Sequence, residues 1–183
     1  MSNEIKISKK TIWIVVITLV VIGLFFFIRN GGNLSTGNIV MSGQIGSQVG
    51  DIAPSFPLQT IDGENIFSEK FKGKKIVIGF FATWCTPCQI EAANVKQVDD
   101  ETGGDKFIVY QIGVDPKESS QQLQTFKSIF GNNDWILGIG MDVAREYNVK
   151  SLDTTFILDE EGNIIYRDNG IPASLEVLRE HLA

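Results

Sequence analysis

Cysteine and histidine are scarce in this sequence: 183 residues contain two Cys and one His, which is His181. Structural zinc usually takes four Cys or His ligands, so the composition argues against such a site. Basic residues are also few, with 16 Lys and Arg against 22 Asp and Glu and a net charge of −6. An acidic chain without a basic patch argues against a nucleic-acid partner. Internal repeats are lacking too, which excludes a repeat architecture.

The sequence does contain one long apolar run, Thr11 to Ile28, with 18 residues and no charge. As a helix it would extend about 27 Å, near the thickness of the hydrocarbon core of a bilayer. Lysines precede the run and Arg29 closes it, so the positive-inside rule places the N-terminus in the cytoplasm. We predict a cytoplasmic tail at 1–10 and a single-pass signal anchor in the lipid bilayer at 11–29.

Two alternatives to an anchor exist. A cleaved signal peptide has an apolar core of about 7–15 residues and a small-residue cleavage site. This run is longer, and Phe25 to Asn30 offers no such site. A buried core helix fits poorly because the segment is terminal and apolar on every face. The anchor is favoured, and its cleavage stays open.

The rest of the chain divides into a linker and one domain. Residues 30–48 are rich in Gly, Ser and Asn, which predicts a flexible tether. Residues 49–183 then make one domain of ordinary size, with strands and helices that alternate into a mixed α/β sheet. The expected strands are 56–60 and 66–67 as a hairpin around Asp62-Gly63, then 76–81, 107–114, 154–158 and 164–166, and the expected helices are 89–100, 118–130, 142–147 and 174–182.

Both cysteines lie where a buried strand passes into a helix, in Trp84-Cys85-Thr86-Pro87-Cys88. A thiolate is the nucleophile in disulfide exchange, and the N-terminus of a helix stabilises negative charge. We therefore expect a lowered pKa for Cys85, which attacks, and a shielded Cys88, which resolves the mixed disulfide. A purely structural disulfide would close too short a loop to stabilise the fold much. A metal half-site is the other alternative, and His181 is expected on a helix surface.

Three further stretches carry a family resemblance: V-G-D-I-A-P-S-F at 49–56, F-K-G-K-K-I-V-I at 71–78 before F-F-A-T-W-C-T-P-C, and D-T-T-F-I-L-D-E-E-G at 153–162. They resemble the extracytoplasmic thioredoxin-like proteins of the TlpA/ResA type, and the first motif is shared with peroxiredoxins. The resemblance implies a thioredoxin fold with an N-terminal β-hairpin extension and a central inserted βα unit, tethered to the membrane.

The resemblance also implies an activity. It is thiol–disulfide exchange with protein thiols and disulfides outside the cytoplasm, usually as a reductant, with cytochrome c maturation as a frequent setting. The redox-active disulfide would serve in place of a cofactor, no metal is expected, and an upstream membrane electron donor would supply the electrons.

Several side chains take roles from this resemblance. Glu91 matches a family glutamate and is expected to relay a proton for Cys88, because Gly79 replaces the buried aspartate of cytoplasmic thioredoxins. An ordinary solvated helix glutamate is the alternative. Trp84 is expected to shield the thiols, with a plain core tryptophan as its alternative. Thr86, Pro87 and Thr154 are expected to shape the site.

The sequence departs from the family at two positions. Asp153 stands where the family has a cis-proline facing the cysteines, and we expect the Leu152–Asp153 peptide to be trans because a cis bond there costs about 2.5–4 kcal/mol. An ionised Asp153 would oppose thiolate formation at Cys85, or could supply a third metal ligand. Ala93 replaces a frequent helix proline, a minor change in helix bend.

Two other functions are alternatives to an oxidoreductase. A peroxiredoxin-like peroxidase usually has Thr three residues before its reactive Cys, where this chain has Ala82, and an Arg beside the thiolate, for which none of the four arginines is an obvious candidate. A thioredoxin-fold copper or other metal chaperone favours a longer Cys–Cys spacer and a well-placed His. The pattern therefore favours a thiol–disulfide oxidoreductase.

Overall fold

The structure of the protein, a computed structural model, describes residues 43–183 and three isolated residues before them, 13, 18 and 19. The predicted cytoplasmic tail, nearly all of the predicted anchor and most of the predicted linker lie outside the described residues. Among the residues that are described, no helix is both long and apolar enough to cross a bilayer. The anchor and the domain boundaries stay predictions from the sequence.

Strand β3 (Lys75–Phe81) is the centre of the fold, and every residue after Lys75 in it is buried. It pairs in parallel with β4 on one side and antiparallel with β6 on the other. A strand flanked on both sides and covered on both faces needs a nearly continuous apolar sequence, which K-I-V-I-G-F-F supplies. The five-stranded sheet has the order β5-β4-β3-β6-β7, with bounds β4 Phe107–Gly113, β5 Ile136–Ile139, β6 Thr154–Leu158 and β7 Ile164–Arg167.

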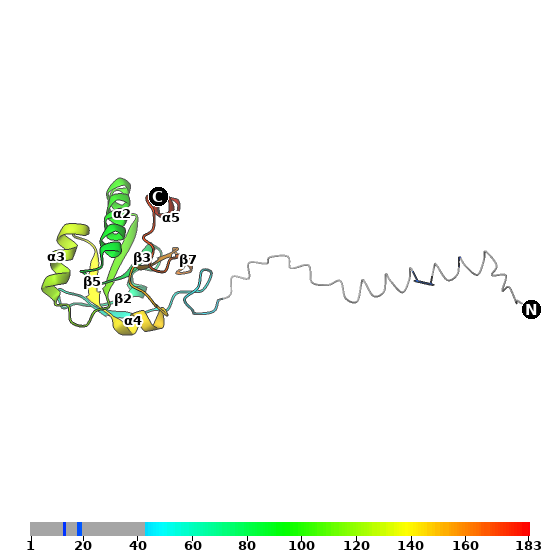
Figure 1. Cartoon of the computed structure of the whole chain (residues 1–183), viewed down its shortest axis with the longest axis horizontal. Coiled ribbons are helices and arrows are strands. Elements are labelled where there is room, and N and C mark those ends of the chain that lie inside the picture. The colour runs from blue at the N-terminus through cyan, green and yellow to red at the C-terminus, as the bar shows by residue number, and fades with distance from the viewer. Residues whose placement is uncertain (1–12, 14–17, 20–42) are drawn as a thin grey trace, which may run out of the picture. The chain divides into compact units, whose positions relative to one another are not determined.

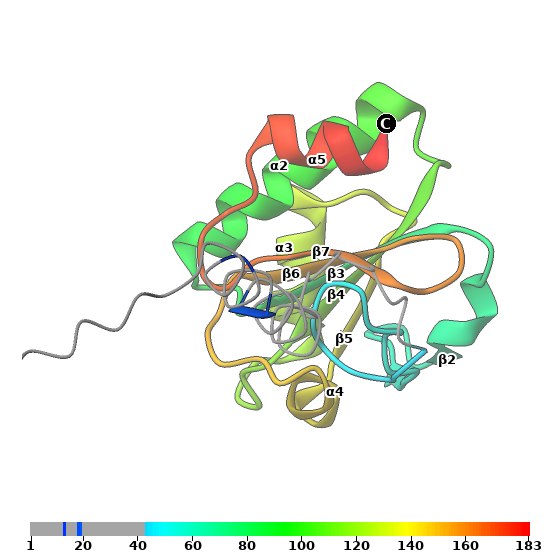
Figure 2. The ribbon, with the colours of Figure 1, turned by 90° about the vertical axis from the view of Figure 1, so that its right-hand side faces the viewer.

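Two hydrophobic cores form, one on each face of this sheet, because successive side chains of β3 point to opposite faces. Val77 and Phe81 pack in the core that holds the cysteines, and Ile78 and Phe80 pack in the other. Helices cover both faces, and Figures 1 and 2 show α2 beside α5 on one face with α4 on the other. The helices are α2 Thr86–Thr102, α3 Ser120–Phe130, α4 Met141–Glu146 and α5 Leu175–Leu182.

The predicted N-terminal hairpin is confirmed. It consists of β1 (Pro57–Gln59) and β2 (Asn65–Phe67), which pair antiparallel, and a 3-10 helix at Ser68–Phe71 follows. Just before the hairpin, residues 44–48, which the sequence assigns to the linker, already bond to the domain: the N–H of Gly46 donates to the carbonyl of Ile52 at 3.0 Å.

Between β4 and β6 lie α3, β5 and α4, and the predicted inserted βα unit falls in this part of the chain. The residue pattern predicts α3 but no strand at Ile136–Ile139, because this run has four residues and contains a glycine. In the structure it forms an edge strand parallel to β4. A buried carboxylate joins the insert to α2, since Asp99 Oδ2 accepts hydrogen bonds from Trp135 Nε1 at 2.9 Å and from Asn132 Nδ2 at 2.7 Å.

The edge strand passes so close to the hairpin that it requires glycine at one position. A Cβ on Gly138 would lie 2.8 Å from Leu58 Cγ and closer still to the carbonyl oxygen of Gln59. We expect Gly138→Ala to lower the free energy of unfolding by about 1–3 kcal/mol, as overpacking typically does. Urea denaturation measures this. The matched control is Gly113→Ala in neighbouring β4, where a Cβ would first meet Leu123 Cδ2 at 3.4 Å; equal losses in both variants would contradict the prediction.

Candidate active site

The two cysteines form a disulfide at the start of α2. Cys85 is the N-cap residue, and its Sγ accepts a hydrogen bond from the backbone N–H of Cys88 at 3.4 Å. Thr86 and Pro87 make the first turn, where a proline loses no helical hydrogen bond. Cys85 is 6% exposed and Cys88 3% exposed, so the sulfurs are largely enclosed and Cys88 is the deeper of the two. The predicted placement of both residues is confirmed.

Two acidic side chains that the sequence analysis missed hold the loop before the helix. The backbone N–H of Thr83 donates to Glu118 Oε1 at 2.6 Å, and the Thr83 hydroxyl donates to the same oxygen. Trp84 Nε1 donates to Asp115 Oδ2 at 3.0 Å. These contacts span 31 and 35 residues, and no local signal marks them. They fix the loop that carries Cys85 to the segment after β4.

Trp84 is 63% exposed, so it is not the core tryptophan of the alternative interpretation. Its indole lies on the surface, next in sequence to Cys85. Ile90, on the first turns of α2, is also an exposed large apolar residue. Apolar side chains therefore reach solvent on both sides of the cysteine pair along the chain. That Trp84 shields the thiols stays a prediction.

Glu91 lies one turn after Cys88 on the same helix face and is 3% exposed, so it is not a solvated helix glutamate. Its polar neighbours are the carboxyl groups of Asp153 and Asp168 and the hydroxyl of Thr155. Neither of its oxygens has a hydrogen-bond partner of normal geometry. Among residues 43–183 no Lys, Arg or His forms an ion pair with any of these three carboxyls. We call Glu91, Asp153 and Asp168 the carboxyl cluster.

Burial raises the pKa of every member of the carboxyl cluster. Burial, then the charge of Asp168, then the contacts with Asp153 raise the pKa of Glu91 to about 10. Burial also raises the pKa of Asp168 to about 7, although the N–H of Thr155 opposes this rise. The pKa of Asp153 is raised as well, again because the group is buried. With the disulfide formed, Glu91 is therefore a neutral carboxylic acid beside Cys88.

Asp153 occupies an unusual backbone conformation, with φ of +60°, in the left-handed region. Aspartate is among the few residues that adopt it readily, whereas proline is fixed near −65°. The predicted trans Leu152–Asp153 peptide is confirmed, because no peptide bond in the described part of the chain is cis. The N–H of Asp153 donates to the carbonyl of Phe80 at 3.2 Å, and its carbonyl accepts from the N–H of Gly170 at 2.8 Å. Both backbone groups of Asp153 are thus engaged within the domain.

A small cavity of about 10 Å³, with room for about one water molecule, lies beside Cys88. Cys88, Glu91 and Asp153 line it together with Gly79 and residues of the sheet. A Cβ on Gly79 would lie 2.8 Å from the amide of Gln111, so a larger residue there would displace that side chain. Thr154, which is also predicted to shape the site, is fully buried and donates its hydroxyl hydrogen to the carbonyl of Ser151 at 2.9 Å.

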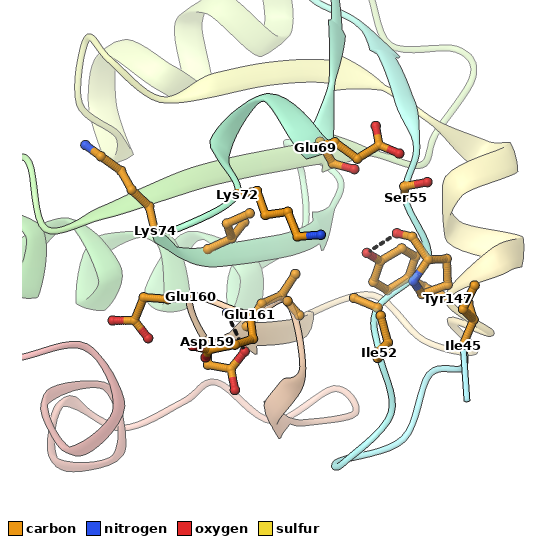
Figure 3. A pocket seen from close by; sticks show the side chains of 16 residues that line it. Ile45, Ile52, Ser55, Glu69, Lys72, Lys74, Tyr147, Asp159, Glu160 and Glu161 are labelled. Atoms are coloured by element: carbon orange, nitrogen blue, oxygen red, sulfur yellow. Dashed lines mark hydrogen bonds between the residues drawn. The ribbon is translucent and has the colours of Figure 1, made fainter. Parts of the chain in front are cut away.

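A second, larger pocket of about 220 Å³ lies away from the disulfide and contains none of the predicted site residues. Figure 3 shows Tyr147 at one end of it, with its hydroxyl bonded to the carbonyl of Pro54, and Lys72, Lys74 and acidic side chains around it. Tyr147 belongs to the core on the opposite face of the sheet from the cysteines. This pocket takes no part in the sulfur chemistry.

The described residues show neither a metal cluster nor an arginine at the disulfide. No group of three or more His, Cys, Asp or Glu side chains in residues 43–183 is arranged to hold a metal ion. Three of the four arginines are described. Arg145 pairs with Asp142, Arg179 with Glu101, and Arg167 donates to the carbonyl of Ser47.

Comparison with known proteins agrees with this geometry. The chain is 36% identical over 122 residues to the thioredoxin-like protein YneN of Bacillus subtilis. The aligned stretch covers 66% of this chain and 71% of that protein. It is 29% identical over 133 residues to the thiol-disulfide oxidoreductase ResA of the same organism, with 70% and 71% covered. A thiol:disulfide interchange protein of the thioredoxin family from Chlorobium tepidum superposes with a TM-score of 0.60 at 26% identity, over 71% of this chain and 92% of that one.

The mixed sheet and the Cys85–Cys88 pair at the start of α2 thus define a thiol–disulfide oxidoreductase of thioredoxin-like fold. The chain belongs to the AhpC/TSA family, whose model matches residues 49–167. The predicted resemblance to proteins of the ResA type is confirmed as well.

Proposed function

We propose that the protein is tethered to the cell membrane by residues 11–29 and reduces disulfides of protein partners outside the cytoplasm through Cys85 and Cys88. The observation that carries this proposal is the disulfide at the N-cap of α2, backed by a protonated and buried Glu91. The tether rests on the apolar run and its charge asymmetry. An upstream membrane electron donor would return the electrons, and cytochrome c maturation is a setting that suits such a reductant.

The reaction begins from the dithiol form. The Cys85 thiolate attacks one sulfur of the partner disulfide, the S–S bond breaks, and the second partner sulfur leaves with the electron pair and takes a proton. Cys88 then passes a proton to Glu91 as Glu91 releases its own proton toward solvent, and the resulting Cys88 thiolate attacks Cys85 Sγ. The Cys85–Cys88 disulfide forms, and the first partner sulfur leaves as a thiolate. The products are the disulfide and a neutral Glu91, which is the state of the structure.

The charges around the pair favour a reductant over an oxidant. Strong oxidants of this fold are those whose reduced form is stabilised. Here the start of α2 stabilises a thiolate at Cys85, whereas Cys88 is buried beside the carboxyl cluster, and no cation in residues 43–183 pairs with that cluster. Burial disfavours a thiolate at Cys88, so ionisation of Cys88 does not stabilise the dithiol form, and this favours a reducing over an oxidising role.

The surface around the pair suits a polypeptide partner. Trp84 and Ile90 are exposed large apolar side chains, and such residues are common where proteins bind one another. A pocket of about 300 Å³ is lined by Thr83 and Gln89, which precede Trp84 and Ile90 in the sequence, and by Ile129 and other residues of α3. A partner chain that places its disulfide at Cys85 would cover this surface.

The test is a redox titration of the full chain in detergent micelles. Samples equilibrated in glutathione and then in dithiothreitol buffers are alkylated, and mass spectrometry counts free Cys85 and Cys88. We expect one reversible two-electron transition. Glutathione buffers should leave the Cys85–Cys88 pair largely oxidised, and dithiothreitol buffers should reduce it. Failure to form a reversible intramolecular disulfide would overturn the oxidoreductase mechanism. Complete reduction by mildly reducing glutathione would overturn the reductant role alone.

A further inference from the structure

The carboxyl cluster brings together three acidic groups from three parts of the chain. Glu91 comes from α2, Asp153 from the turn before β6, and Asp168 from the residue after β7. Within residues 43–183, Asp153 Oδ2, Asp168 Oδ2 and both oxygens of Glu91 are buried and have no hydrogen-bond partner of normal geometry. Unpaired buried carboxylates are costly, so neighbouring carboxyls without cations share protons. The cluster is thus a store of protons behind the disulfide.

Asp168 differs from the other two members because it is only half-buried. Its Oδ1 accepts the backbone N–H of Thr155 at 2.7 Å, and its own N–H donates to the Thr155 carbonyl at 3.1 Å. These two bonds hold the carboxyl in place, and its other oxygen stays free for protonation. Asp168 acts on Glu91 and also on the neighbouring Tyr166. Asp168 is therefore the member of the cluster that reaches the protein surface and also acts on Glu91, while its Oδ2 is itself buried.

We propose that Asp168 relays protons between solvent and Glu91, so that each reduction of the disulfide is followed by reloading of Glu91 through Asp168. This inference rests on the proposed function, since it needs Glu91 to exchange a proton with Cys88. Asp168 touches neither sulfur nor partner and is therefore a positioning and relay residue. No residue pattern in the sequence marks it.

Protons and electrons are both accounted for when the relay accompanies reduction of the disulfide. A donor thiolate attacks Cys85 Sγ, the Cys85–Cys88 bond breaks, and the Cys88 sulfur receives the electron pair. Glu91 then gives its proton to Cys88 Sγ and becomes a carboxylate. The Asp168 carboxyl gives its proton to Glu91 and recovers one from water. When the dithiol reduces a partner, the same proton moves in the opposite direction, from Cys88 through Glu91 and Asp168 to solvent.

Four titratable groups face Glu91: Cys88 on its own helix, Asp153 before β6, and Tyr166 and Asp168 from β7 and its end. Strands β3 and β4 contribute the uncharged Gly79 and Gln111 to the same cavity. Among these groups, the charge of Asp168 is the largest electrostatic influence that raises the pKa of Glu91. Its removal makes the Glu91 carboxylate less costly, so Glu91 loses its proton at a lower pH.

The experiment measures the rate of disulfide reduction in the full chain by dithiothreitol between pH 5 and 10, divided by the concentration of dithiothreitol thiolate. We expect this rate constant to fall on the alkaline side as Glu91 deprotonates. In Asp168→Asn the fall should move to lower pH by about one unit, the size of a typical like-charge effect. Asp168→Glu, which restores a carboxyl, should return the wild-type profile. Asp142→Asn, on exposed α4, makes the same change in net charge and should not move the fall.

The outcomes separate the two proposals. If Glu91→Gln abolishes the alkaline fall but Asp168→Asn leaves it at the wild-type pH, the relay is overturned and the role of Glu91 stands. If Glu91→Gln keeps the fall, both the relay and the role of Glu91 are overturned. A uniform loss of rate in Asp168→Asn without any shift in pH would show a purely structural role and would also overturn the relay.

Discussion

Replacing Cys88 with serine is expected to trap the protein as a mixed disulfide through Cys85. Without the resolving thiol, attack by Cys85 on a partner disulfide gives an adduct that no group within the site can release. Turnover of a protein disulfide should fall by on the order of 10³ or more, as it does when a covalent catalyst loses a reacting group. Intact-mass spectrometry after incubation with oxidised glutathione detects the adduct directly.

The matched control is Cys85→Ser. This variant also loses turnover, but it should form little adduct, because Cys88 is the deeper sulfur and lies against the carboxyl cluster. Comparable adduct yields in the two single variants would contradict the assignment of Cys85 as the attacking residue. A Cys88→Ser protein that still turns over would contradict the resolving role of Cys88.

The Glu91→Gln substitution is expected to stabilise the oxidised protein above neutral pH. Folding raises the pKa of Glu91 from 4.5 to about 10, so the folded chain keeps a proton that the unfolded chain loses. The free energy of unfolding therefore falls as pH rises across this window, by at most about 1.4 kcal/mol per pH unit. Glutamine fills the same space without a titrating proton. We expect a gain of about 1–3 kcal/mol at pH 8 and a flatter pH dependence.

Urea denaturation of the oxidised full chain at several pH values between 5 and 9 measures this effect. Glu180→Gln on α5 is the control: its side chain is exposed, and the change should stay within about 0.5 kcal/mol at every pH. A Glu91→Gln protein that is less stable than wild type throughout the range would contradict the protonated state of Glu91. A stabilised variant that also exchanges disulfides more slowly would show that the acid serves the reaction at the expense of the fold.

The sequence predicts those features of the site that local chemistry determines. Cys85 precedes its helix because a strand ends shortly before it and Pro87 suits a first turn, and Gly103 ends the helix with φ of +95°. The nearly continuous apolar run of β3 likewise predicts a strand that is covered on both faces of the sheet. The sequence also singles out Glu91 and Asp153, although their roles are proposals rather than findings.

The remaining features depend on contacts between distant parts of the chain. Asp168 meets Glu91 only because β7 returns beside β6, and Glu118 meets Thr83 only because α3 starts near the active-site loop. The positive φ of Asp153 follows from bonds to Phe80 on one side and Gly170 on the other. Edge strand β5 is too short to give a periodic pattern of its own. These features arise from tertiary packing, which a single sequence does not display.

The carboxyl cluster also bears on how the protein can change over generations. Three acids lie together with no ion pair to a cation of the described domain, and this holds the oxidised fold below the stability that neutral side chains would give at the same positions. Selection in the laboratory for heat resistance alone should therefore replace Glu91 and Asp168 early, since the hydrophobic cores would not suffer. Selection that also demands disulfide exchange should retain them and find its stabilising substitutions elsewhere. The positions that resist replacement under the second regime but not the first would mark the residues that serve chemistry rather than folding.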